Sequence, residues 1–310
     1  LVDLENRRDL AYALQSESQE QVLKLILNAV ERTGNKNVVV SGGYGLNCVA
    51  NYYYLDTLKD MDINLYVEPV SSDAGTAIGA AFIAYHQTSQ NKEVLPFGES
   101  LYLGLPRNYT SEQVTATAEK YNATLETTDV ESVVKLMCDK NIVAMFQGRS
   151  ESGPRALGNR SLMYDPTDPN GKDHVNKVKR REYFRPFAGT ILAEHAEEWF
   201  DMRGMKESPH MMYAMNCQPG IGEKIPSIIH VDGTCRIQTV TREQNPLYYD
   251  YINEFYKQTG VPIIFNTSFN LGGEPLVETL DDAFRTLANS DIEYLYIAEH
   301  GILAKVENVS

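Results

Sequence analysis

The chain has 310 residues, of which 43% are apolar and 23% charged, and its 28 basic and 42 acidic residues leave a net charge of −14. This length fits one large domain or two ordinary ones, and this composition excludes a disordered or collagen-like chain. So acidic a chain is a poor non-specific binder of nucleic acid or of an anionic membrane, and no apolar run is long enough to span a bilayer.

The four cysteines lie far apart in the sequence, at positions 48, 138, 217 and 235, and form no CxxC pair. This spacing argues against a zinc site built on thiolates and against a secreted disulfide scaffold. No signal-peptide pattern is seen at the start. A reduced, cytoplasmic setting is therefore expected.

The first third of the chain alternates helical and strand patterns. Because the sequence opens with Leu1 inside a helical pattern and lacks a helix start signal, we expect a fragment that begins inside a domain, with a clipped or tag-derived N-terminus as the alternative. The elements predicted here are a helix at 1–32, a strand at 37–41, a helix at 45–54, a strand at 63–67 and a helix at 74–86.

Residues 89–100 are polar and are broken by Pro96 and Gly98, which predicts a linker. A second α/β pattern follows, with Gly- and Arg-rich loops at 147–160 and 165–186. The elements predicted here are helices at 111–121, 130–140, 247–258 and 279–289, and strands at 142–146, 190–192, 228–230, 236–240, 261–266, 294–297 and 302–306.

Two turns in the first part carry candidate ligand-binding residues. A strand that ends at Gly42-Gly43 lets the backbone approach a ligand closely, and the following helix offers free N–H groups to an anion, although a tight turn without a ligand fits the same pattern. Asp73 stands at a strand-to-helix corner, where its carboxylate could cap the helix, bind a metal or contact a ribose hydroxyl.

The middle of the chain is locally basic, since residues 142–187 contain nine Lys or Arg against five Asp or Glu. Arg149, Arg155 and Arg160 are interleaved with Gly and Ser, a pattern that can fold round phosphate oxygens, with a solvated loop as the alternative. Five cations between Lys177 and Arg185 alternate with aromatic residues, which suits a nucleotide-phosphate pocket better than a nucleic-acid surface in so acidic a protein.

Two further segments place polar side chains beside predicted strands. His230 and Asp232 alternate on one of them and would point the same way, next to Arg236, although a histidine on a strand is commonly structural. The segment from Asn266 to Asn270 delivers hydroxyls and amides into a Gly-Gly turn, which suits a polar small molecule, with a plain turn as the alternative. The histidines show neither HExxH nor HxxxH spacing, so a complete metal site within the chain is not predicted.

Six of these motifs occur in the order GGYGLNCVAN, SSDAGTAIGAA, GRSESGPRALGNRS, VKRREYFRPFAG, HVDGTCRIQTV and FNTSFNLGGEP. From about residue 20 to its C-terminus, the chain resembles the O-carbamoyltransferases of the nodulation and antibiotic type, which includes tobramycin carbamoyltransferase-like proteins. The resemblance implies an α/β chain in two parts. Residues 1–95 would be the second half of an actin/hexokinase-like transferase domain, and residues 96–310 a threonylcarbamoyladenylate-synthase-like domain.

The activity that the resemblance implies has two steps. The C-terminal domain would form carbamoyladenylate from carbamoyl phosphate and ATP, and the transferase domain would pass the carbamoyl group to a hydroxyl of a small-molecule acceptor. Because the first half of the transferase domain, with its HxxxH pair, is absent, the chain alone would lack the complete transfer site. Mg²⁺ would accompany ATP, and an iron-type divalent metal would bind in the transferase domain of the intact protein.

The resemblance also assigns residues to roles. It assigns catalysis to Lys179, Arg181, Arg155 and Ser268. It assigns nucleotide and carbamoyl phosphate binding to Gly42, Gly43, Asn47, Arg149, Arg160, Asn270 and His230. It assigns the metal to Asp73. No membrane partner is expected, nucleic acid is disfavoured and a homodimer is left open. The alternatives are a truncated relative that binds nucleotide without catalysis and an RNA-modifying enzyme of the threonylcarbamoyl type.

Overall fold

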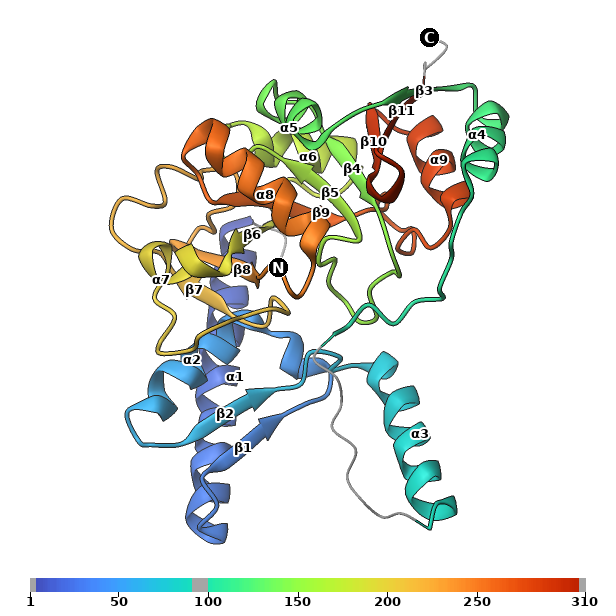
Figure 1. Cartoon of the computed structure of the whole chain (residues 1–310). Coiled ribbons are helices and arrows are strands. Elements are labelled where there is room, and N and C mark those ends of the chain that lie inside the picture. Colours follow the sequence, from blue (N-terminus) through green and yellow to red (C-terminus); the bar gives the residue numbers. More distant parts are fainter. Residues whose placement is uncertain (1–3, 91–99, 307–310) are drawn as a thin grey trace.

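The structure is a computed structural model that describes residues 4–90 and 100–306. A small N-terminal unit and a larger unit, built on a single broad sheet, lie one below the other (Figure 1). None of the helices in the described part of the chain is both long enough and apolar enough to cross a membrane.

The small unit consists of helices around a sheet of two parallel strands, in which Val39 pairs with Tyr66. One side of the long first helix buries Leu23 and Ile26 against the second helix, which buries Tyr54 and Leu58 in the same cluster. The elements of the small unit are α1 (Leu4–Thr33), β1 (Asn37–Val40), the 3₁₀ turn η1 (Gly43–Leu46), α2 (Cys48–Lys59), β2 (Asn64–Val67) and α3 (Asp73–Thr88).

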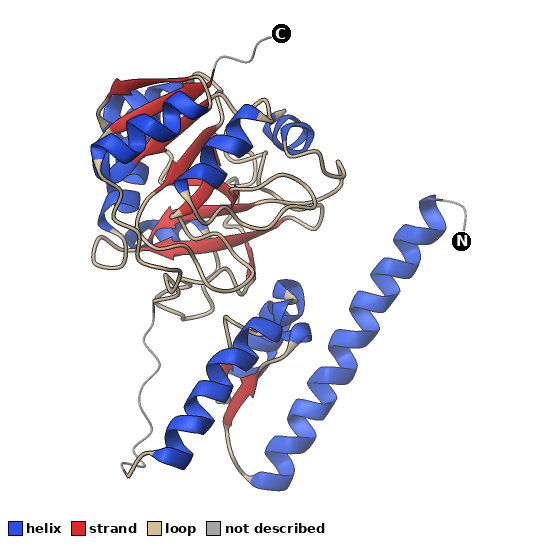
Figure 2. Cartoon of the chain, turned by 90° about the vertical axis from the view of Figure 1, so that its right-hand side faces the viewer, coloured by secondary structure: helices blue, strands red, loops and turns tan. Residues whose placement is uncertain are grey.

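Helices α1 and α3 leave much of their surface uncovered. Figure 2 shows α1 standing along one side of the small unit. Helix α3 buries none of its residues, although its sequence is rich in Ala and includes Ile78 and Ile83. The small unit contacts the larger one through α2 and also through Val70 and Ile78, which join a cluster with Leu157 and Met211.

The larger unit is a mixed nine-stranded sheet in the order β3-β11-β10-β4-β5-β9-β6-β8-β7. Two neighbouring pairs, β10 with β4 and β6 with β8, are parallel, and the other pairs are antiparallel. The strands are β3 (Ala123–Thr127), β4 (Val143–Phe146), β5 (Arg160–Tyr164), β6 (Ala188–Leu192), β7 (Ala214–Asn216), β8 (Thr234–Val240), β9 (Ile263–Ser268), β10 (Tyr294–Ile297) and β11 (Ile302–Val306).

Helices α5 and α8 pack against each other over the central strands, and α4 and α9 pack together beside β3, β10 and β11. Helix α8 begins at Pro246, and the side chain of its N-cap residue, Asn245, accepts the Tyr248 N–H. The helix ends at Thr259, and its C-cap, Gly260, adopts the left-handed conformation. The helices of this unit are α4 (Ser111–Lys120), α5 (Val130–Cys138), α6 (Gly171–Val178), α7 (Ala196–Trp199), α8 (Pro246–Thr259) and α9 (Leu280–Ala288), with 3₁₀ turns η2 (Ala193–His195) and η3 (Ala298–His300).

Most of the predicted elements are confirmed to within a few residues, and the α/β class is correct. The strand predicted at 228–230 is wrong, because this segment forms the end of a turn and irregular backbone before β8. The loop predicted at 165–186 contains α6, and β3, β5 and β7 were not predicted. Of the predicted linker, residues 91–99 lie outside the described residues.

Helix α2 joins the two units. The buried Asn51 amide donates to the Met212 carbonyl at 2.9 Å, and the Tyr52 hydroxyl donates to the Asp201 carbonyl at 3.0 Å. Arg203 forms an ion pair with Asp56 at 2.6 Å. These contacts bring the turn from Gly43 to Leu46 next to the Gly- and Arg-rich loop of the larger unit.

Candidate anion-binding active site

Two adjoining cavities lie on the larger unit and share Arg181, Arg185 and Ser268. The first, here called the arginine cavity, has a volume of about 540 Å³ and is lined by four arginines together with residues of the β9 end and of the loop before β5. The second, here called the lysine cavity, has a volume of about 660 Å³ and adjoins Lys179 and the Gly272-Gly273 turn. The arginines of the first are Arg155, Arg181, Arg185 and Arg236.

Arg155 and Arg236 face the arginine cavity with buried donors that have no partner. Arg155 donates from Nη2 to the Leu46 carbonyl at 3.1 Å, but its Nε meets no acceptor among the described residues. The Nε of Arg236 is buried in the same way, within the described part of the chain. Burial, and then the charge of Arg236, lowers the pKa of Arg155 to about 10. Both guanidiniums place positive charge beside the cavity, which attracts an anion.

Arg181 is held flat against the wall between the two cavities. Its Nε donates to the Asn176 amide oxygen at 3.0 Å, and its guanidinium lies over the Phe187 ring at 4.6 Å. Burial, followed by the charges of Arg185 and Arg236, lowers the pKa of Arg181 to about 10. The fork is therefore oriented by neutral neighbours, and its charge is left for a ligand.

Lys179 is the C-cap residue that follows α6, and it is almost completely buried under the loop after β9. Its ammonium donates to the carbonyl of Ser268, to the carbonyl of Asn270 at 2.8 Å and to the Asn270 amide oxygen at 3.0 Å. The Gly272 N–H closes the loop by donating to the Lys179 carbonyl at 2.7 Å. Burial, and then the charge of Arg181, lowers the pKa of Lys179 to about 7.

A buried carboxylate shapes the loop that carries Arg155. One oxygen of Glu151 accepts the backbone N–H groups of Leu157 at 2.7 Å, Asn159 at 2.9 Å and Arg160 at 3.3 Å. Burial raises the pKa of Glu151, although these N–H groups oppose the rise. The carboxylate therefore curls residues 151–160 so that Arg155 reaches the cavity.

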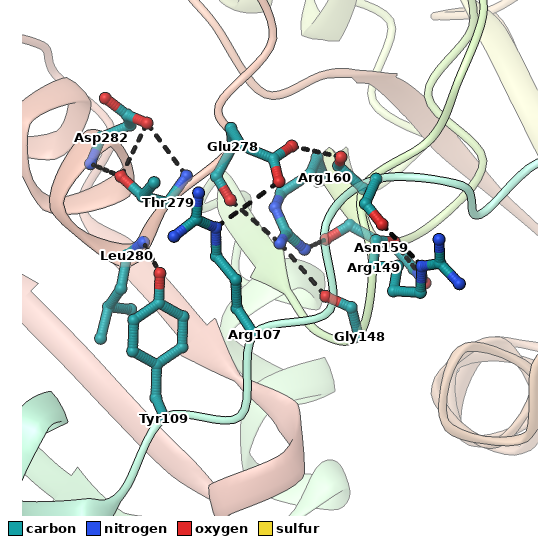
Figure 3. A network of polar contacts seen from close by, with 12 residues as sticks. Arg107, Tyr109, Gly148, Arg149, Asn159, Arg160, Glu278, Thr279, Leu280 and Asp282 are labelled. Carbon is teal, nitrogen blue, oxygen red and sulfur yellow. Dashed lines mark hydrogen bonds and ion pairs between the residues drawn. The ribbon is translucent and has the colours of Figure 1, made fainter.

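Arg149 and Arg160 are held away from Arg155, in a network of their own (Figure 3). Arg160 is completely buried and donates to four carbonyls, among them Gln147 at 2.6 Å and Glu278 at 3.2 Å, with its guanidinium 3.7 Å from the Phe146 ring centre. Arg149 donates to the carbonyls of Leu103 and Gly104. Of the three arginines in this motif, only Arg155 lines the arginine cavity.

His230 lies behind the arginine cavity. Its Nε2 is 3.1 Å from the Phe187 carbonyl and its Nδ1 is 3.1 Å from the Thr234 hydroxyl. Because a carbonyl only accepts, Nε2 carries the proton. Burial lowers the pKa of His230 and favours the neutral ring. Asp232 binds Thr234 from a turn, so the predicted alternation of His230 and Asp232 along a strand is wrong.

Of the residues predicted in the small unit, Gly42 lines a separate cavity of about 400 Å³, together with Ser72, whereas Gly43, Asn47 and Asp73 do not line it. Gly42 has φ 84°, a conformation that favours glycine. The Asn47 side chain caps α2 by accepting the Ala50 N–H at 3.1 Å and also binds Gln15. Gly43 begins η1 and is exposed.

Asp73 is exposed at the first position of α3, and the N-cap position is Ser72 rather than Asp73. Across residues 4–90 and 100–306, no three His, Cys, Asp or Glu side chains cluster in a way that could hold a metal ion. Asp73 therefore does not form a metal site with the other described residues, and its assignment as a ligand stays a prediction.

The arrangement suits a ligand with several negative charges. Four arginines line one cavity and a buried lysine stands beside the next. Glu182, a carboxylate that lines the lysine cavity, is paired with Arg185 at 2.6 Å. Arg236 was noted in the sequence but not assigned to the site, and Glu151 was not singled out. The sequence signal that could have identified Arg236 is that it is the single charged residue of strand β8.

Comparison with known proteins identifies the family. The model described as "Carbamoyltransferase C-terminus" matches residues 134–304, and "Carbamoyltransferase N-terminus" matches residues 2–82. The chain therefore belongs to the carbamoyltransferase family, and the resemblance found in its motifs is confirmed.

Curated relatives agree with this assignment. The nodulation protein NolO of Bradyrhizobium diazoefficiens is 35% identical over 304 residues, which are 94% of this chain and 54% of that protein. An uncharacterized protein of Synechocystis is also 35% identical, over 96% of this chain and 52% of its own length. Nodulation protein U of Rhizobium tropici is 33% identical over 77% of this chain and 39% of its own length. The chain thus spans about half the length of the curated relatives it matches.

Among solved structures, full-length HypF in a phosphate- and nucleotide-bound form is similar over 58% of this chain and 25% of its own, with 19% identity and a TM-score of 0.39. HypF of T. kodakarensis gives the same TM-score with 17% identity, over 60% of this chain and 23% of its own.

Proposed function

We propose that this chain is part of an ATP-dependent O-carbamoyltransferase. In its larger unit, carbamoyl phosphate, ATP and one water would become carbamoyladenylate, inorganic phosphate and pyrophosphate. The carbamoyl group would then pass to a hydroxyl of a small-molecule acceptor. The observation that carries the proposal is the arginine cavity, in which Arg155 and Arg236 keep buried donors without partners among the described residues.

The chain's own residues supply positioning and positive charge. Joining two polyanions requires neutralisation that strengthens as charge builds on the leaving phosphate. Arg155 and Arg181 would hold phosphate oxygens in the arginine cavity, and Lys179 would serve the adjoining lysine cavity. Ser268 and Asn270 hold the Lys179 ammonium in place, so we assign them an orienting role.

The two units would correspond to two domains, residues 1–95 and 96–310, of which the second forms the adenylate. In the first, we keep Gly42, Gly43 and Asn47 as the turn that would receive the adenylate, since Gly42 lines the cavity beside α3. Arg155 connects these two places, because its guanidinium binds the Leu46 carbonyl between Gly43 and Asn47.

The test is exchange of labelled pyrophosphate into ATP by the 310-residue chain, with and without carbamoyl phosphate. We expect exchange that depends on carbamoyl phosphate. In Arg181→Ala or Lys179→Ala it should fall about 10- to 100-fold, because a charge-assisted contact contributes about 1.5–3 kcal/mol. Arg285→Ala is the matched control, since Arg285 is exposed, pairs with Asp282 within α9 and lines neither cavity. Full exchange in both site variants would refute the assignment.

The same assay separates the proposal from its alternatives. A truncated relative that only binds nucleotide would bind ATP without exchange. An RNA-modifying enzyme would need a basic surface for its substrate, whereas this chain carries a net charge of −14.

A further inference from the structure

Among the described residues that line the arginine cavity, Asn266 carries an unpaired group of the opposite kind, an acceptor. Besides the buried Nε atoms of Arg155 and Arg236, the cavity is lined by Asn266, which is 1% exposed. Within the described residues, the Oδ1 of Asn266 has no hydrogen-bond donor. An acceptor that lacks a partner is an exception in a cavity otherwise rich in donors.

The orientation of the Asn266 amide follows from its neighbours. Its Nδ2 is 3.1 Å from the Ala156 carbonyl and 3.0 Å from the Thr190 hydroxyl oxygen. The carbonyl only accepts, so the atom facing it must be the nitrogen.

The hydrogen bonds of the Thr190 hydroxyl independently indicate the same orientation of the Asn266 amide. Gln238 donates from Nε2 to the Leu157 carbonyl at 3.0 Å, which turns its Oε1 toward Thr190. Thr190 therefore donates its single proton to that oxygen, at 2.9 Å, and accepts from Asn266 and Tyr248. The Oδ1 of Asn266 is thus the atom left free.

We infer that Asn266 selects the carbamoyl group by accepting an N–H from its amino group. The inference rests on the proposed function and names a specificity-determining residue of the same site. The unpaired arginine donors call for an anion, and the unpaired amide oxygen calls for a ligand that also carries an N–H donor. Carbamoyl phosphate has both groups, whereas inorganic phosphate and acetyl phosphate have only the first.

Thr267, the neighbour of Asn266 in β9, also lines the cavity but does not supply this selectivity. A hydroxyl both donates and accepts, so it accommodates a ligand with or without an N–H group. An amide oxygen accepts only, and a buried one left unpaired by the wrong ligand weakens binding of that ligand.

The test compares carbamoyl phosphate with acetyl phosphate, which has a methyl group in place of the amino group. We expect the unmodified 310-residue chain to bind carbamoyl phosphate at least about tenfold more tightly in calorimetric titrations, since sites built to bind an N–H reject analogues that lack it. In Asn266→Ala the two dissociation constants should converge. Thr267→Val, altered in the same cavity, should keep the preference.

Asn266→Asp covers the case in which Asn266→Ala binds neither phosphate, because Asp keeps an accepting oxygen. It should bind both ligands more weakly and retain the preference. The inference is overturned if Asn266→Ala still prefers carbamoyl phosphate. If Asn266→Ala binds neither ligand, the inference is overturned when Asn266→Asp has lost the preference. If the unmodified chain binds carbamoyl phosphate and catalyses exchange without any preference, the inference fails alone. If it neither binds nor exchanges, the proposed function fails.

Discussion

Lys179 is surrounded by acceptors but not by a carboxylate. Its ammonium is bound by the carbonyls and side chains of Ser268 and Asn270, all of them neutral. Burial and the nearby Arg181 bring the pKa of Lys179 to about 7, close to neutral pH. A bound anion would supply the missing negative charge and stabilise the protonated form.

This pKa predicts a pH dependence of anion binding. Below about pH 7, Lys179 is protonated and attracts an anion, and as pH rises through the pKa that attraction is lost. The affinity for sulfate, whose charge is constant over this range, should therefore fall between about pH 6 and pH 8. Lys179→Met should bind sulfate weakly and with a flatter profile in the same calorimetric titration. Equal slopes in both proteins would contradict the assigned pKa.

A second residue-scale prediction concerns Glu151. Glu151→Ala leaves the N–H groups of Leu157, Asn159 and Arg160 without their acceptor, which should lower the free energy of unfolding by about 3 kcal/mol. Glu151→Gln keeps an accepting oxygen and should lose less, about 1 kcal/mol. Urea denaturation measures both. Glu119→Ala, at an exposed position of α4, is the control and should change little.

Single residues were only partly predictable. Arg149, Arg155 and Arg160 have the same Gly- and Ser-rich surroundings in the sequence, yet Arg160 is buried against carbonyls and Phe146 while Arg155 faces a cavity. The difference depends on the path of the loop, which Glu151 sets by accepting three backbone N–H groups six, eight and nine residues further along the chain. Local sequence carries no signal for that path.

At the scale of elements, patterns of apolar residues predicted strands such as β4 and β9 well, because β4 is apolar throughout and β9 begins with three apolar residues. Strand β5 was missed because it begins with the buried Arg160, and β7 because it has three residues. The stretch from Ile228 to His230 resembles a strand, but it forms a turn and irregular backbone in which Ile228 is buried.

The Gly- and Arg-rich loop depends on Gly158. This residue has φ +113°, and a Cβ here would lie 2.2 Å from the Tyr248 ring. Gly158→Ala should therefore lower the free energy of unfolding by about 3 kcal/mol or more. Gly220→Ala is the matched control, because Gly220 has φ +80° and open space around the added carbon. It should lose only about 1 kcal/mol. Equal losses in urea denaturation would show that the close approach to Tyr248 is unimportant.

At the scale of the whole molecule, the two units meet through α2. Asn51 is fully buried and donates from one nitrogen to Gly45 at 2.7 Å and to Met212 at 2.9 Å. This contact joins residues 161 positions apart, so no local pattern predicted it. The sequence did indicate two parts, through the polar stretch between two α/β patterns, but not the side of the sheet on which the small unit rests.

Asn51→Ala should separate the stability of the two units. It removes both donors and leaves two buried carbonyls unpaired, which should cost about 2 kcal/mol. Because the loss falls on the contact between the units, we expect scanning calorimetry to resolve an earlier transition for the small unit. Asn64→Ala loses an exposed side-chain hydrogen bond to Asn37 within the small unit and leaves the contact between the units intact, so it should melt nearly as the unmodified chain does. A single, merely shifted transition in Asn51→Ala would argue that the units unfold together.

The basic stretch within an otherwise acidic chain also has a kinetic consequence. Nine cations against five anions occupy residues 142–187, while the chain as a whole carries −14. A phosphorylated ligand therefore approaches through a repulsive far field and meets attraction only near the arginines. Since the Debye length is about 10 Å in 0.1 M salt, moderate salt should suppress the far field more than the contacts inside the cavity. Association of carbamoyl phosphate in stopped flow should thus become faster with moderate added salt while dissociation changes less, the reverse of an electrostatically steered encounter.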